Sequence, residues 1–190
     1  LRTVLESRLQ LPGHPRFLTY IVTWGCNARC VMCDCWRKPR GSELTVRELE
    51  RVLAGLPPMD GVRLSGGEPF LRRDLRQIAD RIAHHLHPFA LHITTNGLLT
   101  DRIVRFCEER DQTVPLQLMV SLDAVGAKHD AIRGVRRSWQ RALRTLQTLA
   151  PRQSELGLHL SVNQTVVDTE GADSYWDLRN RLGELGVHNN

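Results

Sequence analysis

Three cysteines lie close together near the start of the chain, at Cys26, Cys30 and Cys33, with three and then two residues between them. Thiolates are soft ligands that favour iron–sulfur clusters, zinc or copper(I). A structural zinc site normally takes four ligands in two separated pairs, which this stretch lacks. A cluster held entirely by protein takes four cysteines, so three leave one iron open to a second molecule. The spacing therefore predicts a cluster-binding loop with one open position.

A small zinc knuckle, completed by Cys35 or by a histidine, is the alternative for this loop. Cys35 lies two residues beyond the last proposed ligand and outside the spacing, so we expect it to be a bystander. Cys107 falls in a predicted helix and is expected to fill the core. Four of the five cysteines crowd into residues 26–35, which favours metal binding over disulfides. Reduced thiols are typical of the cytoplasm, so we expect a cytoplasmic protein.

Stretches rich in β-branched and aromatic residues alternate along the chain with stretches of helical periodicity. We expect strands over 17–24, 61–64, 89–93, 116–120 and 158–162, and a sixth strand beginning at the end of the chain. We expect helix starts at Thr45, Asp74, Thr100, Ser138 and near Asp173, with helix ends at Pro57-Pro58, Pro151 and Gly186. This alternation implies parallel strands joined by right-handed crossovers.

The length bounds the architecture. A full eight-unit barrel needs about 250 residues, and the chain has 190. The sequence therefore predicts an α/β fold, a partial TIM-like barrel of (β/α)6 type that is truncated at its C-terminal side. We expect residues 1–16 to form an N-terminal extension and residues 17–190 to form one incomplete core domain. Because the chain begins with Leu1 and ends as a strand begins, we expect it to be a piece of a longer protein.

Composition and charge limit the kinds of partner. The apolar fraction of 41% and the charged fraction of 25% are those of a globular protein. No apolar run approaches the length of a membrane span, so we expect no membrane partner. The chain carries 26 basic and 21 acidic residues, a net charge of +5. This mild excess permits an anionic substrate, an acidic electron donor or RNA without selecting one.

The predicted strands share one feature: each is apolar along its body and polar or glycine-rich at its C-terminal end. These ends are Gly25-Cys26, Gly66-Gly67-Glu68, Asn96-Gly97, Ser121 with Asp123, and Asn163. The active sites of α/β barrels lie at the C-terminal ends of the strands. We therefore expect the cysteine loop and the other polar strand ends to converge on one site.

The C-x3-C-x2-C spacing, followed by Gly66-Gly67-Glu68-Pro69, resembles the radical S-adenosylmethionine (SAM) superfamily from about Phe17 onward. The segment from His129 to Gly134 resembles one in molybdenum-cofactor-biosynthesis-A-like and SPASM-type peptide-modifying members. The resemblance implies a 4Fe-4S cluster on the three cysteines and SAM on its open iron. It implies reductive cleavage of SAM to methionine and a 5′-deoxyadenosyl radical, which abstracts hydrogen from an unidentified substrate. It also implies an electron donor such as flavodoxin or ferredoxin.

The resemblance assigns Gly66, Gly67 and Glu68 to the methionine end of SAM. An ammonium group needs acceptors, and glycines let backbone carbonyls approach closely. Glu68 is expected either to accept a hydrogen bond directly from SAM or to brace the loop. A tight turn with an exposed glutamate is the alternative for this motif.

Four further residues complete the predicted SAM site. Met32 takes the position where the family often carries an aromatic residue against the adenine, and methionine can also pack there. Ser121 and Asn163 are expected at the ribose or the methionine carboxylate, with backbone capping as the alternative. Arg133 is expected to pair with the SAM carboxylate, with a structural salt bridge as the alternative.

A hypothesis from another class is a non-catalytic zinc or iron–sulfur binding module that contacts RNA through Arg137, Arg141 and Arg144. These arginines follow one face of a predicted helix, and a solvated face is the simpler interpretation. We therefore expect no nucleic-acid partner. The pairing of the cysteine loop with Glu68 and two glycines favours the enzyme, since a binding module does not need them. The substrate does not follow from these residues.

Overall fold

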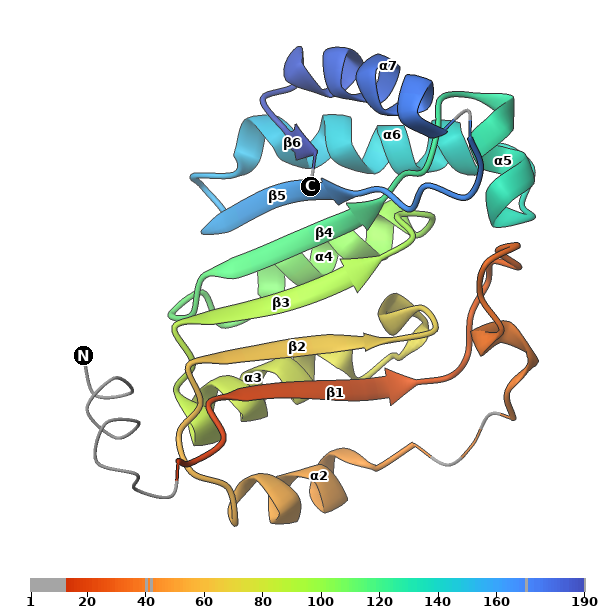
Figure 1. Cartoon of the computed structure of the whole chain (residues 1–190). Helices are drawn as coiled ribbons and strands as arrows, with labels where there is room; N and C mark the ends of the chain where they lie inside the picture. Colours follow the sequence, from red (N-terminus) through yellow and green to blue (C-terminus); the bar gives the residue numbers. More distant parts are fainter. Residues whose placement is uncertain (1–12, 40, 42, 170, 190) are drawn as a thin grey trace.

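A computed structural model describes residues 13–39, 41, 43–169 and 171–189. Six parallel strands form one sheet in the sequential order β1-β2-β3-β4-β5-β6 (Figure 1). Their bounds are β1 Phe17–Thr23, β2 Gly61–Gly66, β3 Ala90–Thr95, β4 Leu116–Ser121, β5 Leu158–Asn163 and β6 His188–Asn189. The predicted α/β class with parallel strands in chain order is confirmed. Residues 1–12 of the predicted N-terminal extension lie outside the described residues.

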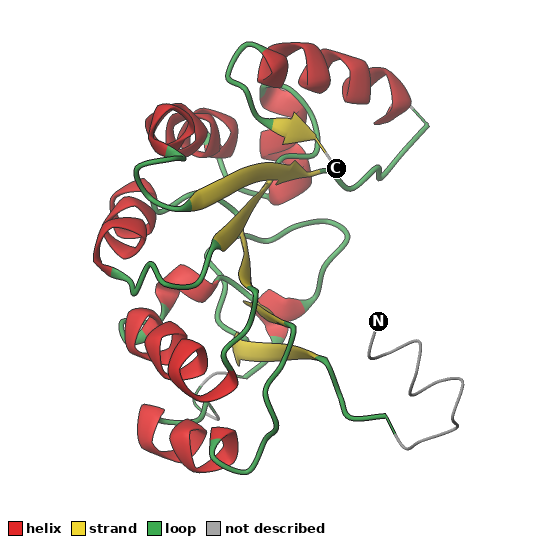
Figure 2. Cartoon of the chain, turned by 90° about the vertical axis from the view of Figure 1, so that its left-hand side faces the viewer, coloured by secondary structure: helices red, strands yellow, loops and turns green. Residues whose placement is uncertain are grey.

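Helices connect the strands and gather on one side of the sheet (Figure 2). Their bounds are α2 Val46–Leu53, α3 Leu75–Leu86, α4 Thr100–Glu109, α5 Ala127–Arg133, α6 Ser138–Leu149 and α7 Gly171–Gly183, with 3-10 turns η1 Cys35–Arg37, η2 Pro69–Leu71 and η3 Ala150–Arg152. The core lies between sheet and helices. In β3, for example, Leu91 and Ile93 are buried while His92 and Thr94 face the other side. No helix in the described ranges is long and apolar enough to cross a membrane.

Of three predicted helix caps, one forms and two do not. At α2, Thr45 and Glu48 form the predicted capping box. Asp74 stands at the N-cap of α3, but its carboxylate accepts hydrogen bonds from Arg72 instead of capping the helix. Ser138 is the first residue of α6 and not its cap. The Asp130 carboxylate of α5 caps the N-terminus of α6 instead, accepting from the backbone amides at 137 and 139 at 2.6 and 2.8 Å.

Helix ends also differ from the periodic pattern. Helix α2 stops at Leu53, before Pro57-Pro58, because Gly55 and the following turn leave the helical path first. Helix α7 begins at Gly171, earlier than Asp173, and ends at Gly183. Gly186, with a φ of +64°, turns the chain toward β6 and does not cap the helix directly. Helix α5 was not predicted because seven residues are too few for a periodic signal.

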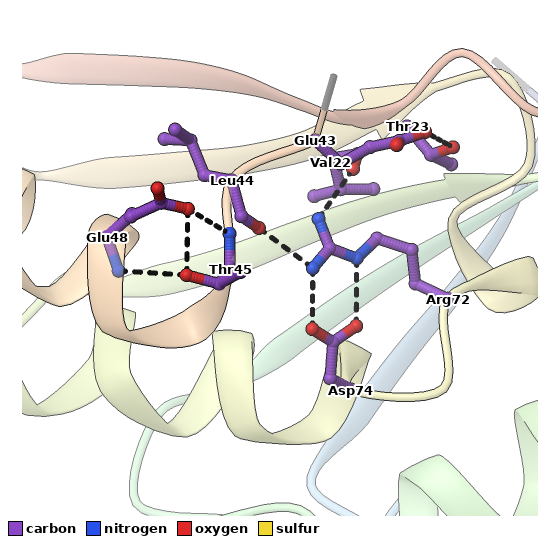
Figure 3. A network of polar contacts seen from close by, with 8 residues as sticks. All are labelled: Val22, Thr23, Glu43, Leu44, Thr45, Glu48, Arg72 and Asp74. Carbon is purple, nitrogen blue, oxygen red and sulfur yellow. Dashed lines mark hydrogen bonds and ion pairs between the residues drawn. The ribbon is translucent and has the colours of Figure 1, made fainter. Parts of the chain in front are cut away.

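Arg72 fixes both ends of the long loop that carries the cysteines. Its guanidinium donates to the carbonyl of Val22, at the end of β1, and to the carbonyl of Leu44, just before α2, each at 3.0 Å (Figure 3). The same group binds both oxygens of Asp74, at 2.8 and 2.5 Å. Beside it, the Thr23 hydroxyl donates to Glu43 at 2.6 Å. The loop is therefore anchored at its two ends to the C-terminal edge of the sheet.

Candidate cluster and cofactor site

A cavity of about 200 Å³ opens at the C-terminal ends of β1 to β5. It is lined by nearly all the residues predicted for the site, namely Cys26, Cys30, Met32, Cys33, Gly66, Gly67, Ser121, Arg133 and Asn163. Glu68 is the exception, because its side chain is completely buried beneath the cavity wall. The structure thus brings together polar residues from five strand ends, as the parallel topology predicts.

The cysteine loop is held over the cavity by the end of α5. The backbone amides of Arg29 and Val31 donate to the carbonyls of Arg133 and Ile132, each at 2.9 Å. Gly134 ends α5 with a φ of +62°, and a side chain there would place its Cβ 2.6 Å from the Arg29 carbonyl oxygen. The segment from His129 to Gly134, for which the sequence showed a family resemblance, therefore positions the cysteine loop through its backbone.

The three cysteines line one cavity, and two of their thiols receive hydrogen bonds. The amide of Ala28 donates to Cys26 Sγ at 3.4 Å, and the guanidinium of Arg133 donates to Cys30 Sγ at 3.6 Å. Burial raises the pKa of both thiols, and Arg133 opposes the rise at Cys30. Hydrogen bonds to cysteine sulfur are among the contacts by which proteins tune iron–sulfur clusters.

The arrangement of these thiols bears on which group they hold. Within the described residues, no three His, Cys, Asp or Glu side chains are placed to hold a single metal ion together. Thiolates around a four-iron cluster stand farther apart than those around one ion, because each binds a different iron. The three cysteines line one cavity with polar walls, which is compatible with a cluster, and the choice between a cluster and a zinc knuckle stays a prediction.

The glycine pair serves the chain's own backbone as well as the cavity. A Cβ on Gly66 would lie 2.2 Å from the Thr23 carbonyl oxygen, and one on Gly67 would lie 2.2 Å from the Gly25 carbonyl oxygen. The amides of Gly67 and Glu68 donate to these same two carbonyls, each at 2.8 Å. The glycines thus allow the end of β2 to pack directly on the start of the cysteine loop. This packing role comes in addition to the SAM contact that the family resemblance implies for them.

Glu68 braces the floor of the site. Its Oε1 accepts from the amide of Phe70 at 3.1 Å and from the hydroxyl of Thr95 at 2.8 Å, and its Oε2 accepts from the amide of Asn96 at 2.7 Å. Burial raises its pKa to about 7, against the opposing effect of these three donors. Of the two roles considered for Glu68, this geometry supports the brace, which ties the end of β2 to the end of β3.

Arg133 forms a structural salt bridge, which was the alternative to its predicted contact with the SAM carboxylate. Its Nε forms an ion pair with Asp123 Oδ2 at 2.6 Å, and its Nη2 donates to Asp123 Oδ1 at 2.9 Å. Asp123 is fully buried and also accepts from the amide of Thr165 at 3.1 Å. Arg133 therefore already has a carboxylate partner, while its remaining nitrogen reaches the cysteine loop. Contact with the SAM carboxylate stays a prediction.

Asn96 lies at one of the polar strand ends expected at the site, although Asn-Gly is also an ordinary turn signal. Its side-chain amide donates to Asn27 Oδ1 at 2.7 Å and approaches Cys26 Sγ at 3.9 Å. Its side-chain oxygen accepts from the backbone amide of Leu98 at 3.0 Å, and its backbone amide donates to Glu68. Its place at a strand end, in line with Ser121 and Asn163, predicted its presence at the site but not these contacts.

The two remaining cysteines differ in setting. Cys107 is fully buried in the core, as predicted, and burial raises its pKa to about 12. Cys35 begins η1 and lines the same cavity as the three proposed ligands. Burial and a hydrogen bond with Cys33 raise the pKa of Cys35 to about 11. Its exclusion from the ligand set stays a prediction.

Glu68→Gln is expected to lower the free energy of unfolding by about 1–3 kcal/mol, because the new amide NH2 must face one of three buried donors. The measurement is urea unfolding at pH 8, where the native carboxyl is ionised because its pKa is about 7. Glu109→Gln is the matched control, since Glu109 is exposed and makes only a 3.8 Å ion pair. Equal stability of the two variants would contradict the bracing role.

The chain matches known proteins over most of its length. The model of the radical SAM superfamily matches residues 20–182. A GTP 3′,8-cyclase from Rhodopseudomonas palustris is 29% identical over 179 residues, which are 90% of this chain and 50% of the cyclase. Mycofactocin maturase MftC from Mycobacterium tuberculosis is 31% identical over 175 residues, 89% of this chain and 43% of the maturase. The chain thus spans about half the length of these relatives.

Solved structures show the same fold. Streptococcus suis SuiB bound to S-adenosylmethionine has a TM-score of 0.74 at 17% identity, over 98% of this chain and 43% of SuiB. Native anSMEcpe with bound AdoMet and Cp18Cys peptide has a TM-score of 0.64 at 15% identity, over 92% of this chain and 50% of that one. The fold is therefore the partial TIM barrel that these proteins share. With the family model covering most of the sequence, the chain belongs to the radical SAM superfamily, whose cofactors are a 4Fe-4S cluster and SAM.

Proposed function

We propose that this chain is the cofactor-binding core of a radical SAM enzyme, in which Cys26, Cys30 and Cys33 hold the 4Fe-4S cluster. The observation that supports the proposal most directly is that the three thiols share one cavity with the polar ends of four other strands. When bound and reduced, the cluster supplies the electron that cleaves SAM to methionine and a 5′-deoxyadenosyl radical, which takes hydrogen from the substrate.

The residues around the cavity are suited to hold SAM. The Gly66-Gly67 backbone lines the cavity and can offer carbonyl acceptors to an ammonium group. The side chains of Ser121 and Asn163 also line it, and neither hydrogen-bonds to another side chain or backbone group in the described part of the chain. They are therefore available to the ribose or the carboxylate. Met32, 39% exposed, can pack against the adenine.

Radical SAM enzymes need a reductant and a substrate. We infer that the reductant is a small one-electron protein of the flavodoxin or ferredoxin type. The relatives do not select the substrate, since the cyclase is named for GTP and SuiB has been solved with a precursor peptide.

Anaerobically purified protein is expected to be brown, to hold about four irons and four sulfides per chain, and to form 5′-deoxyadenosine from SAM under strong reduction. The measurements are iron and sulfide analysis and chromatographic detection of 5′-deoxyadenosine, with a sample lacking reductant as the control. Colourless protein with one zinc per chain would favour the binding module instead. A cluster-loaded protein that forms no 5′-deoxyadenosine with any strong reductant would contradict the proposed enzymatic function.

A further inference from the structure

One face of the sheet is not covered by the helices (Figures 1 and 2). Because side chains alternate along a strand, the neighbours of the buried core residues point to this open face. Four of them stand level with one another on four adjacent strands, since Arg63 pairs in register with His92, His92 with Gln117, and Gln117 with His159. We call Arg63, His92, Gln117 and His159 the cross-strand row.

Within the cross-strand row, the positive charge of Arg63 has no carboxylate partner among the described residues. No residue of β1 to β5 is an aspartate or a glutamate. Among the described residues, Arg63 has no ion pair or hydrogen bond; its guanidinium lies 5.9 Å from the centre of the Phe17 ring. By contrast, Arg72 and Arg133, which also lie at the sheet, each bind a carboxylate. An exposed arginine without a carboxylate partner is a ready receptor for an oxyanion.

The other members of the row can add neutral donors around Arg63. The ring of His92 lies 5.9 Å from that of Phe17, which places both His92 and Arg63 beside the same aromatic side chain. Burial and the nearby Arg63 lower the pKa of His92, so at neutral pH its imidazole offers one N–H donor without charge. The amide of Gln117 offers two more donors. Arg63 thus supplies the charge, and its neighbours supply hydrogen bonds.

The row lies at a useful distance from the cofactor cavity. Ser65, which lines the cavity, is two residues beyond Arg63 on β2. Ser121 and Asn163, which also line it, are four residues beyond Gln117 and His159. A strand rises about 3.3 Å per residue, so the row lies roughly 7–13 Å below the cavity. A small organic molecule can span that distance with one end at each site.

We propose that the cross-strand row binds the carboxylate or phosphate group of the substrate and so directs its other end toward the cofactor cavity. This inference rests on the proposed function for its substrate role. It names the substrate class, an organic oxyanion, and makes Arg63 the residue that determines specificity for it. The apolar Phe17 and Ile21 on the adjoining strand β1 face the same side and offer packing for the body of the molecule.

The test titrates cluster-loaded protein with inorganic pyrophosphate and, separately, with succinate, following the ring signals of His92 and His159 by NMR. Saturable shifts with pyrophosphate alone assign the row to phosphate, and shifts with succinate alone assign it to carboxylate. Arg63→Gln is expected to weaken the binding by about tenfold or more, the loss expected for a charged hydrogen bond. Arg105→Gln, an equal charge change on exposed helix α4, is expected to leave the affinity unchanged.

Two results would contradict anion binding at the cross-strand row. One is no saturable shift of His92 with either anion, and the other is equal affinity of the Arg63→Gln and Arg105→Gln proteins. Formation of 5′-deoxyadenosine by the unsubstituted protein is measured on the same samples. If the protein cleaves SAM but binds neither anion, the anion site is refuted and the proposed function is retained. Protein that binds an anion at the row but never cleaves SAM overturns the proposed function, and with it the substrate role, while the anion site remains.

Discussion

Replacing Cys26, Cys30 or Cys33 by alanine is expected to reduce the iron content from about four per chain to near zero. SAM cleavage should fall to background in the same variants. Each thiol lines the cavity, and a cluster already one cysteine short of full protein ligation cannot lose another. Cys35→Ala and Cys107→Ala should keep both the cluster and the activity, because Cys35 lies outside the ligand spacing and Cys107 is in the core.

Iron and sulfide analysis of the five variants tests this ligand set, with circular dichroism to show that each protein has folded. Cys35 is the informative control because it lines the same cavity as the proposed ligands and hydrogen-bonds with Cys33. Loss of the cluster in Cys35→Ala, together with its retention in Cys33→Ala, would overturn the assignment and place Cys35 in the ligand set.

The fold could be predicted because its signals are local and repeat. Each of the first five strands ends within two residues of its prediction, since β-branched runs bounded by turn residues mark strands independently of the rest of the chain. The helix caps were less predictable because they depend on tertiary partners. The Asp74 carboxylate binds Arg72, which also holds the cysteine loop. The N-terminus of α6 is capped by Asp130 from helix α5.

The membership of the site could be predicted, but the roles of some members could not. Strand-end positions identified Ser121 and Asn163 because parallel topology brings such ends together. Sequence does not show which way a side chain points, so it left Glu68 between a SAM contact and a brace, and the structure bonds its carboxylate to Thr95 and Asn96. The same limit left Asn96 ambiguous between a site residue and a turn residue.

Gly67→Ala is expected to cause a large loss of stability, because the conflict is with backbone atoms. The new Cβ would lie 2.2 Å from the carbonyl oxygen of Gly25 and 2.8 Å from that of Trp24. Backbone carbonyls cannot rotate away as a flexible side chain can, so the ends of β1 and β2 must separate. That movement breaks two hydrogen bonds, from the amide of Gly67 to Thr23 and from the amide of Glu68 to Gly25.

We expect the free energy of unfolding of Gly67→Ala to fall by about 3 kcal/mol or more, as overpacking and lost hydrogen bonds act together. Cluster content should fall as well, because Gly25 is where the cysteine loop leaves the sheet. Urea unfolding and iron analysis measure the two effects. Gly183→Ala, at a position with no atom within 4 Å of the new Cβ, should be neutral or slightly stabilising. If Gly67→Ala keeps wild-type stability and four irons, the direct packing of β2 on the cysteine loop does not position the cluster.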